Sequence, residues 1–307
     1  MSATVKVWVS DPEGVDLLGP LPDGVTVEVY DGDGAYPSDP AEVEFWTPPF
    51  LSGPEATRHL ARMTGLRVIQ LPTAGAEIWV DKVPERVTLC DARGAHTSAT
   101  AEWVVAAILS HVRCFPRFVR AQDRRKWDYT ATDTLDGKRV LIVGAGSIGE
   151  ATAARLAPFG ARVTSVARRP RPGVHGVQEL PDLLGEADIV VLLVPLTDQT
   201  RGMVDADFLR RMPDGALLVN AARGAVVDTA ALTAELASGR LAAALDVTDP
   251  EPLPPNHPLW TMPNVFITPH IGGSVPGGVR RIYTLVREQL HRYLAGEELI
   301  NVVRDGY

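Results

Sequence analysis

Three glycines at a fixed spacing, Gly144, Gly146 and Gly149, form the clearest chemical signal in the chain. They follow the apolar run 139–143, which is typical of a buried strand, and residues 150–156 after them are compatible with a helix. The first glycine permits a tight turn, the second lets the backbone approach a pyrophosphate, and the third lets the helix lie close to the strand. The helix N-terminus adds unpaired N–H groups and a positive dipole end. We therefore predict a dinucleotide-binding loop whose contacts are Gly144, Gly146, Ser147, Ile148 and Gly149.

The residues after the next expected strand, 162–166, indicate which dinucleotide would bind. An NAD site places an acidic residue about 20 positions after the glycines, where it holds the ribose hydroxyls. This chain has Ala167 there, followed by Arg168 and Arg169. A carboxylate would repel a 2′-phosphate, whereas two guanidiniums attract it and bind it through forked hydrogen bonds. We predict NADP(H) in preference to NAD(H); the alternative interpretation is an exposed basic turn.

Three further polar segments follow expected strands, where ligands gather in open α/β sheets. The first contains Arg223 followed by glycine, the second contains Glu251 between two prolines, and the third contains His270 between Thr-Pro and two glycines. Each residue also has a plain interpretation, as a surface arginine, a loop carboxylate, or a surface or core histidine. No His-Glu-x-x-His run or paired-cysteine spacing is present, so the sequence implies no metal.

Taken together, these blocks resemble the D-isomer-specific 2-hydroxyacid dehydrogenases, a family that includes glyoxylate/hydroxypyruvate reductases and phosphoglycerate dehydrogenase. The resemblance spans nearly the whole chain and rests on several separate motifs. They are the glycine loop, the three segments around Arg223, Glu251 and His270, and the runs Ala74-Gly75, Ala101-Glu102 and Pro195-Leu196-Thr197.

The resemblance implies a role for each of these residues. Arg223 would bind the substrate carboxylate and polarise the carbonyl. His270 would be the general acid that protonates the developing alkoxide, and Glu251 would hydrogen-bond His270 and favour its protonated form. Ala74 and Gly75 would offer backbone N–H groups to the same carboxylate. The remaining cofactor contacts implied by the family are Val194, Pro195, Ala221, Ala222, Asp246 at the nicotinamide carboxamide, Gly272 and Gly273.

Two departures from the family pattern leave the substrate open. Thr248 stands where the family commonly has an aromatic residue, and Ala76-Glu77 stands where many members have Val-Asp. Glu251 argues against formate dehydrogenase activity, because formate dehydrogenases of this fold have glutamine at that position.

The elements that must position these residues alternate between strands and helices. Alternation of this kind predicts parallel sheets covered on both faces, here two doubly wound α/β domains. We expect a Rossmann nucleotide domain over 98–274, inserted into a flavodoxin-like substrate domain formed by 1–97 and 275–307, with the active site in the cleft between them. Expected helices are 54–63, 97–115 and 278–295, the last packing on the first lobe. Expected strands are 5–9, 25–30, 43–46, 66–71, 87–90, 139–143, 162–166, 189–194, 216–219, 242–246 and 265–268.

Composition narrows the class of protein. A chain of 307 residues with 45% hydrophobic content suits two domains. Residues 1–97 hold 15 acidic against 7 basic residues and so account for the net charge of −8, and no basic stripe suggests nucleic acid. No long apolar stretch or secretory signal is visible, and two cysteines fit a reduced compartment, so we expect a cytoplasmic protein with no membrane partner. Cys90 is interpreted as strand core and Cys114 as helix interior.

The sequence therefore predicts an oxidoreductase that interconverts a small 2-oxo acid and its D-2-hydroxy acid, with glyoxylate or hydroxypyruvate first among substrates. The resemblance also implies a homodimer formed through the nucleotide domain, to which an exposed segment such as 120–129, with Trp127, would contribute. Two alternatives remain open. One is a regulator that senses the dinucleotide, and the other is a reductase of an unusual carbonyl or imine.

Overall fold

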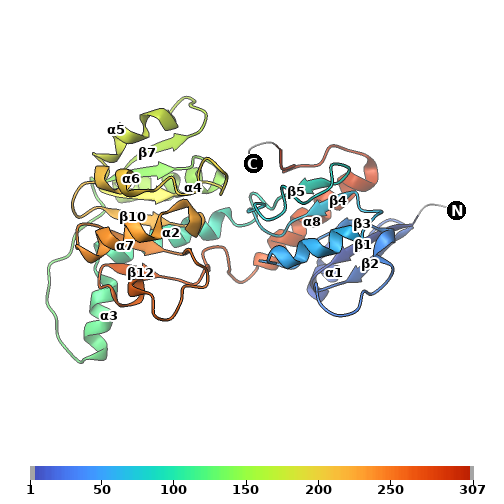
Figure 1. The fold of residues 1–307 in the computed structure, drawn as a ribbon, viewed down its shortest axis with the longest axis horizontal. Coiled ribbons are helices and arrows are strands. Elements are labelled where there is room, and N and C mark those ends of the chain that lie inside the picture. The colour runs from blue at the N-terminus through green and yellow to red at the C-terminus, as the bar shows by residue number, and fades with distance from the viewer. Residues whose placement is uncertain (1–3, 305–307) are drawn as a thin grey trace. The chain divides into compact units, whose positions relative to one another are not determined.

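The computed structural model describes residues 4–304, which form two compact units (Figure 1). The first unit runs up to His96 and resumes at Pro276, while the second extends from Thr97 to Val275. Each unit has its own parallel sheet and its own hydrophobic clusters on the two faces of that sheet. The predicted fold class, with two doubly wound α/β domains, is confirmed.

The first unit is built on a five-stranded sheet in the order β2-β1-β3-β4-β5, with every strand pair parallel. This order is that of flavodoxin-like folds. One face packs against α1 and α8, and the other carries an aromatic cluster that includes Trp8, Tyr30 and Trp46. The elements are β1 (Val5–Val9), α1 (Pro12–Leu18), β2 (Val25–Val29), η1 (Pro40–Glu42), β3 (Val43–Trp46), η2 (Pro54–Ala61), β4 (Val68–Gln70), β5 (Thr88–Cys90) and α8 (Gly278–Ala295).

The last helix, α8, has the bounds that the sequence predicted, and it packs on the first unit through Ile282, Val286 and Leu290. It ends where Gly296 adopts a left-handed conformation (φ 68°) that favours glycine. The expected helix 54–63 is instead the 3₁₀ helix η2. Side chains three residues apart align in a 3₁₀ helix, and this brings Ala56 and His59 together into the core.

The second unit is built on a seven-stranded parallel sheet in the order β12-β11-β10-β9-β6-β7-β8. The strand order reverses beside β6, as it does in Rossmann folds, and β12 extends the sheet by one strand. The strands are β6 (Arg139–Val143), β7 (Arg162–Ala167), β8 (His175–Gly176), β9 (Ile189–Leu192), β10 (Leu217–Asn220), β11 (Ala242–Leu245) and β12 (Val265–Ile267). The helices are α2 (Thr97–Val112), α3 (Phe115–Asp123), α4 (Ser147–Leu156), η3 (Ala157–Phe159), η4 (Val177–Glu179), α5 (Leu180–Leu184), α6 (Ala206–Arg211), η5 (Gly224–Val226), α7 (Thr229–Ala237) and η6 (Pro258–Thr261).

The helix expected over 97–115 ends at Val112, and a separate helix, α3, follows it. Cys114 lies at the break with a left-handed backbone (φ 54°), so the expectation that it sits inside a helix is wrong. Pro116 stands in the first turn of α3, where its missing N–H removes no helical hydrogen bond. Figure 1 shows α3 extending beyond the sheet of the second unit, followed by a loop that returns toward the sheet.

The parallel sheet of the second unit gathers its functional candidates at one edge. In such a sheet all carboxyl ends of the strands face the same side, and β6, β7, β9, β10, β11 and β12 each lead into a residue singled out by the sequence. Residues far apart in the chain therefore come together here.

Candidate active site

The glycine loop between β6 and α4 has the shape that a pyrophosphate requires. Gly144 has φ 117°, and a Cβ there would lie 2.5 Å from the backbone of Leu193. A Cβ on Gly149 would lie 2.2 Å from the carbonyl oxygen of Gly144. Gly146, by contrast, faces open space, and it caps α4 without a side-chain hydrogen bond. The loop thus leaves room beside a helix N-terminus whose N–H groups suit an anion, and a dinucleotide fits it.

The turn after β7 carries the basic residues of the predicted 2′-phosphate site. Arg168 and Arg169 are both exposed, directly beyond Ala167 at the strand end. Arg171, which was not among the predicted cofactor contacts, donates to the carbonyl oxygen of Ala145 at 2.5 Å and to Glu150 at 3.0 Å. Arg171 therefore ties this turn to the glycine loop, so that guanidiniums and loop amides lie on the same side of the unit.

The structure brings His270 and Glu251 together from separate loops. His270 Nδ1 lies 2.7 Å from Glu251 Oε1, and the two side chains are 25% and 41% exposed. Because a carboxylate can only accept, Nδ1 carries the proton in this contact, and Nε2 is left for another partner. His270 also has a left-handed backbone (φ 55°), which is uncommon for a residue other than glycine and typical of functional sites.

The pKa of Glu251 lies below the ordinary glutamate value. Burial is the largest single influence and raises this pKa, but several lowering influences together outweigh it, led by the hydrogen bond and the charge of His270. The backbone of Thr248 and the charge of Arg223 add to the lowering. The charges of His270 and Arg223 therefore both favour the anionic form of Glu251. The three candidate catalytic residues are close enough to influence one another electrostatically.

Arg223 is positioned by groups that the sequence did not single out. Asn220, which ends β10 and is 1% exposed, donates through Nδ2 to the carbonyl oxygen of Arg223 at 3.0 Å and accepts from the N–H of Ala222 at 3.0 Å. A Cβ on Gly224 would lie 1.9 Å from the carbonyl oxygen of Thr248. The Arg223 loop thus packs directly on the loop that carries Glu251. The sequence signal that could have identified Asn220 is a polar residue at the end of an otherwise apolar strand.

The other predicted site residues lie where their strands end. In the second unit, Asp246 follows β11 and accepts hydrogen bonds from the N–H groups of Ile271 and Gly272. In the first unit, the turn after β4 is closed by the Thr73 hydroxyl, which donates to the carbonyl oxygen of Gly75 at 2.8 Å. The assignment of that turn to the substrate stays a prediction. The remaining candidates of the second unit are Val194 and Pro195 after β9, Ala221 and Ala222 after β10, and Gly273 after β12.

Residues 4–304 contain no helix with both the length and the hydropathy that a bilayer crossing requires. Within the same range, no three His, Cys, Asp or Glu side chains gather in a way that could bind a metal ion.

A family model described as "D-isomer specific 2-hydroxyacid dehydrogenase, NAD binding domain" matches residues 105–272. A glyoxylate reductase/hydroxypyruvate reductase from Mus musculus is 36% identical over 248 residues, which cover 76% of this chain and 76% of the mouse protein.

Two solved structures share the fold over nearly the whole chain. A D-isomer specific 2-hydroxyacid dehydrogenase from Xanthobacter autotrophicus Py2, in complex with NADPH and MES, has a TM-score of 0.85, 34% identity, and coverage of 99% of this chain and 98% of that one. An NADPH-dependent glyoxylate/hydroxypyruvate reductase from Sinorhizobium meliloti, in complex with NADP and sulfate, has a TM-score of 0.83, 29% identity, and coverage of 98% of each chain.

The Glu251–His270 contact predicts a pH dependence. Because the folded-state pKa of Glu251 is lowered, the contact contributes stability at neutral pH that is lost as pH falls through that pKa. Removing the imidazole in His270→Ala leaves burial as the main influence, so the pKa of Glu251 should rise. Titration of the Glu251 carboxyl carbon by NMR measures both values. A wild-type pKa at or above the ordinary value of a glutamate side chain would contradict the prediction.

Proposed function

The chain belongs to the D-isomer specific 2-hydroxyacid dehydrogenase family, and on that premise we propose that it reduces a small 2-oxo acid to the D-2-hydroxy acid with NADPH. Glyoxylate and hydroxypyruvate are the first substrates to test. The observation that carries the proposal is the 2.7 Å contact between His270 and Glu251, with the charge of Arg223 acting on the same carboxylate.

In the proposed reaction, named side chains bind the substrate and transfer the proton. When bound, the dinucleotide supplies the hydride. The Arg223 guanidinium, whose loop Asn220 holds, binds the substrate carboxylate and draws electron density from the carbonyl oxygen. His270 delivers a proton from Nε2 to that oxygen, while Glu251 stabilises the imidazolium through Nδ1. In the oxidative direction His270 takes the proton back.

The proposed preference for NADPH rests on the turn after β7. In this turn Ala167 takes the position of the acidic residue of an NAD site, Arg168 and Arg169 follow it directly, and Arg171 holds the turn against the glycine loop. Relatives solved with NADPH or NADP are consistent with this choice. A 2′-phosphate at the turn would gain charge-assisted hydrogen bonds that NADH cannot form.

Substitution of the carboxylate-binding arginine tests the proposed reaction. Arg223→Gln should lower kcat/KM about a hundred- to a thousand-fold, because the positive fork that binds the carboxylate and polarises the carbonyl is lost. Binding of NADPH, followed by its fluorescence, should not change. The control is Arg211→Gln, an exposed arginine at the end of α6. NADPH oxidation is followed by absorbance with a panel of 2-oxo acids, other carbonyls and imines. No turnover with any of them would instead favour a dinucleotide-sensing regulator.

Substitution of the basic turn tests the cofactor. The double variant Arg168→Ala/Arg169→Ala should raise KM for NADPH about ten- to a hundred-fold and leave KM for NADH nearly unchanged, since only NADPH carries the 2′-phosphate. Arg162→Ala, at the opposite end of β7, is the control. A wild-type enzyme that prefers NADH, or a double variant that affects both cofactors equally, would refute the proposed preference.

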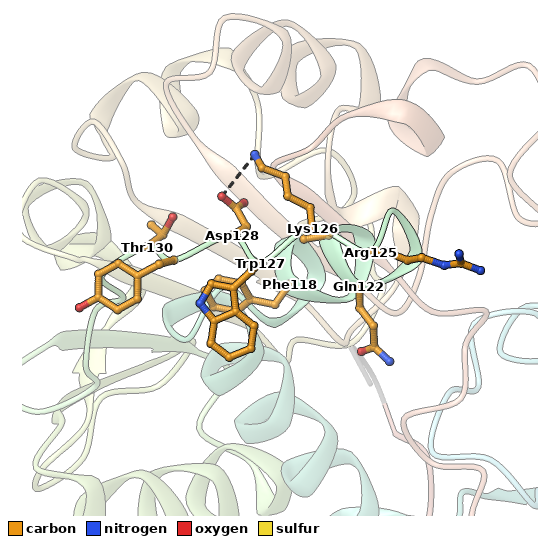
Figure 2. A pocket seen from close by; sticks show the side chains of 9 residues that line it. Phe118, Gln122, Arg125, Lys126, Trp127, Asp128 and Thr130 are labelled. Carbon is orange, nitrogen blue, oxygen red and sulfur yellow. Dashed lines mark ion pairs between the residues drawn. The ribbon is translucent and has the colours of Figure 1, made fainter.

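We also propose that the protein is a homodimer formed through α3 and the segment that follows it. Trp127 and Tyr129 are 95% and 90% exposed, and they line a groove of about 580 Å³ with Phe118 (Figure 2). Asp128 bonds to Arg117 at 2.9 Å, which folds the segment back on α3. Large apolar rings exposed to this degree favour burial, and tryptophan and tyrosine are enriched at protein interfaces.

Truncation of the exposed aromatics tests the dimer. Trp127→Ala/Tyr129→Ala should weaken self-association at least about a hundred-fold, because large buried aromatics dominate interface energies. Sedimentation equilibrium across a concentration series measures the dissociation constant. Phe159→Ala, which removes another exposed ring of the same unit, is the matched control. A wild-type protein that sediments as a monomer, or a double variant with an unchanged constant, would exclude this interface.

A further inference from the structure

We infer that Asp246 is a positioning residue for the His270 loop, beyond any contact it makes with the cofactor. The inference rests on the proposed role of His270 as proton donor. The family resemblance implied only a nicotinamide contact for Asp246, whereas its side chain accepts hydrogen bonds from residues on both sides of His270.

The carboxylate of Asp246 binds the loop before and after the histidine. Oδ1 accepts from the Thr268 hydroxyl at 2.6 Å and from the N–H of Ile271 at 2.9 Å, and Oδ2 accepts from the N–H of Gly272 at 2.8 Å. The backbone carbonyl of Asp246 also accepts from the N–H of His270 at 2.8 Å. The residue is only 4% exposed, so these bonds are shielded from competition with water.

The loop needs this restraint because of its backbone conformation. His270 has φ 55°, a conformation that residues other than glycine adopt only when the surroundings hold them there. A Cβ on Gly272 would lie 2.8 Å from Oδ2 of Asp246, so glycine is what allows this close approach. Gly272 therefore has a structural reason to be glycine that is independent of its predicted contact with the cofactor.

The same residue connects the proton donor to the carboxylate-binding arginine. The N–H of Asp246 donates to the carbonyl oxygen of Asn220 at 2.9 Å, and the Asn220 side chain holds the Arg223 loop. Two buried polar side chains at the ends of neighbouring strands thus set the positions of His270 and Arg223. Misplacing a catalytic group by about 1 Å can slow turnover by about a hundred-fold.

Thr268→Val tests the inference without changing a charge. Valine keeps the shape of threonine but removes the hydroxyl that donates to Oδ1, so the loop loses a bond to a carboxylate. We expect kcat for reduction of the preferred 2-oxo acid to fall about ten- to a hundred-fold, with KM and the Kd for NADPH changed less than about two-fold. The solvent deuterium isotope effect on kcat should rise, because proton delivery becomes slower. Thr268→Ser restores the hydroxyl and should restore kcat.

A second readout needs neither substrate nor cofactor. Amide hydrogen exchange at Ile271 and Gly272 should accelerate in Asp246→Asn and Thr268→Val, because an amide loses protection when its bonded loop opens more often. Thr233→Val is the matched control, since the hydroxyl of Thr233 donates to the carbonyl oxygen of Thr229 within α7, away from the His270 loop in the sequence. It should leave kcat and both exchange rates unchanged.

The outcomes separate this inference from the proposed function. Wild-type protein that reduces no substrate in the panel overturns the proposed function. Active wild-type protein whose Thr268→Val variant keeps full kcat overturns the positioning role. Asp246→Asn that weakens NADPH binding while Thr268→Val changes nothing would make Asp246 a cofactor contact only, and also overturns it.

Discussion

The hydrogen bond between His270 Nδ1 and Glu251 Oε1 is the interaction on which the candidate active site depends. It fixes the proton on Nδ1, leaves Nε2 for another partner, and favours the ionised form of Glu251 against the opposing effect of partial burial. The bond forms only if two loops, one after β11 and one after β12, hold their positions. Close backbone packing at glycines and hydrogen bonds from buried side chains hold these two loops in place.

Several glycines stand where two segments lie too close together for a side chain to fit between them. Gly224 lets the Arg223 loop touch Thr248, and Gly272 lets the His270 loop reach Asp246. Gly144 and Gly149 do the same for the turn between β6 and α4, whereas Gly146 leaves space open. Glycine thus serves two physical purposes here, which are dense packing of loops and room for a ligand.

The parallel sheet explains why such distant residues can act together. Every strand of the second unit ends at the same edge, so the glycine loop, the basic turn, Asn220, Asp246 and His270 are presented side by side. The sheet alone does not fix the positions of these side chains to within about an ångström. That precision comes from buried side chains: Asn220 donates to and accepts from the backbone of the Arg223 loop, and Asp246 accepts from the backbone of the His270 loop.

The sequence by itself predicted the architecture and the dinucleotide loop, because apolar periodicity and glycine spacing act between near neighbours in the chain. The sequence also singled out Arg223, Glu251 and His270 in segments that follow expected strands, and the family resemblance suggested the roles predicted for them. The sequence further predicted the bounds of α8, whose apolar stripe and terminal glycine are local signals. Only the tertiary structure decided that Cys114 interrupts a helix, that η2 is 3₁₀, and that Asn220, Asp246 and Arg171 hold the loops. Asp246 is more than 20 residues from the loop it binds. Such contacts depend on side-chain reach across strand ends, which no local spacing encodes.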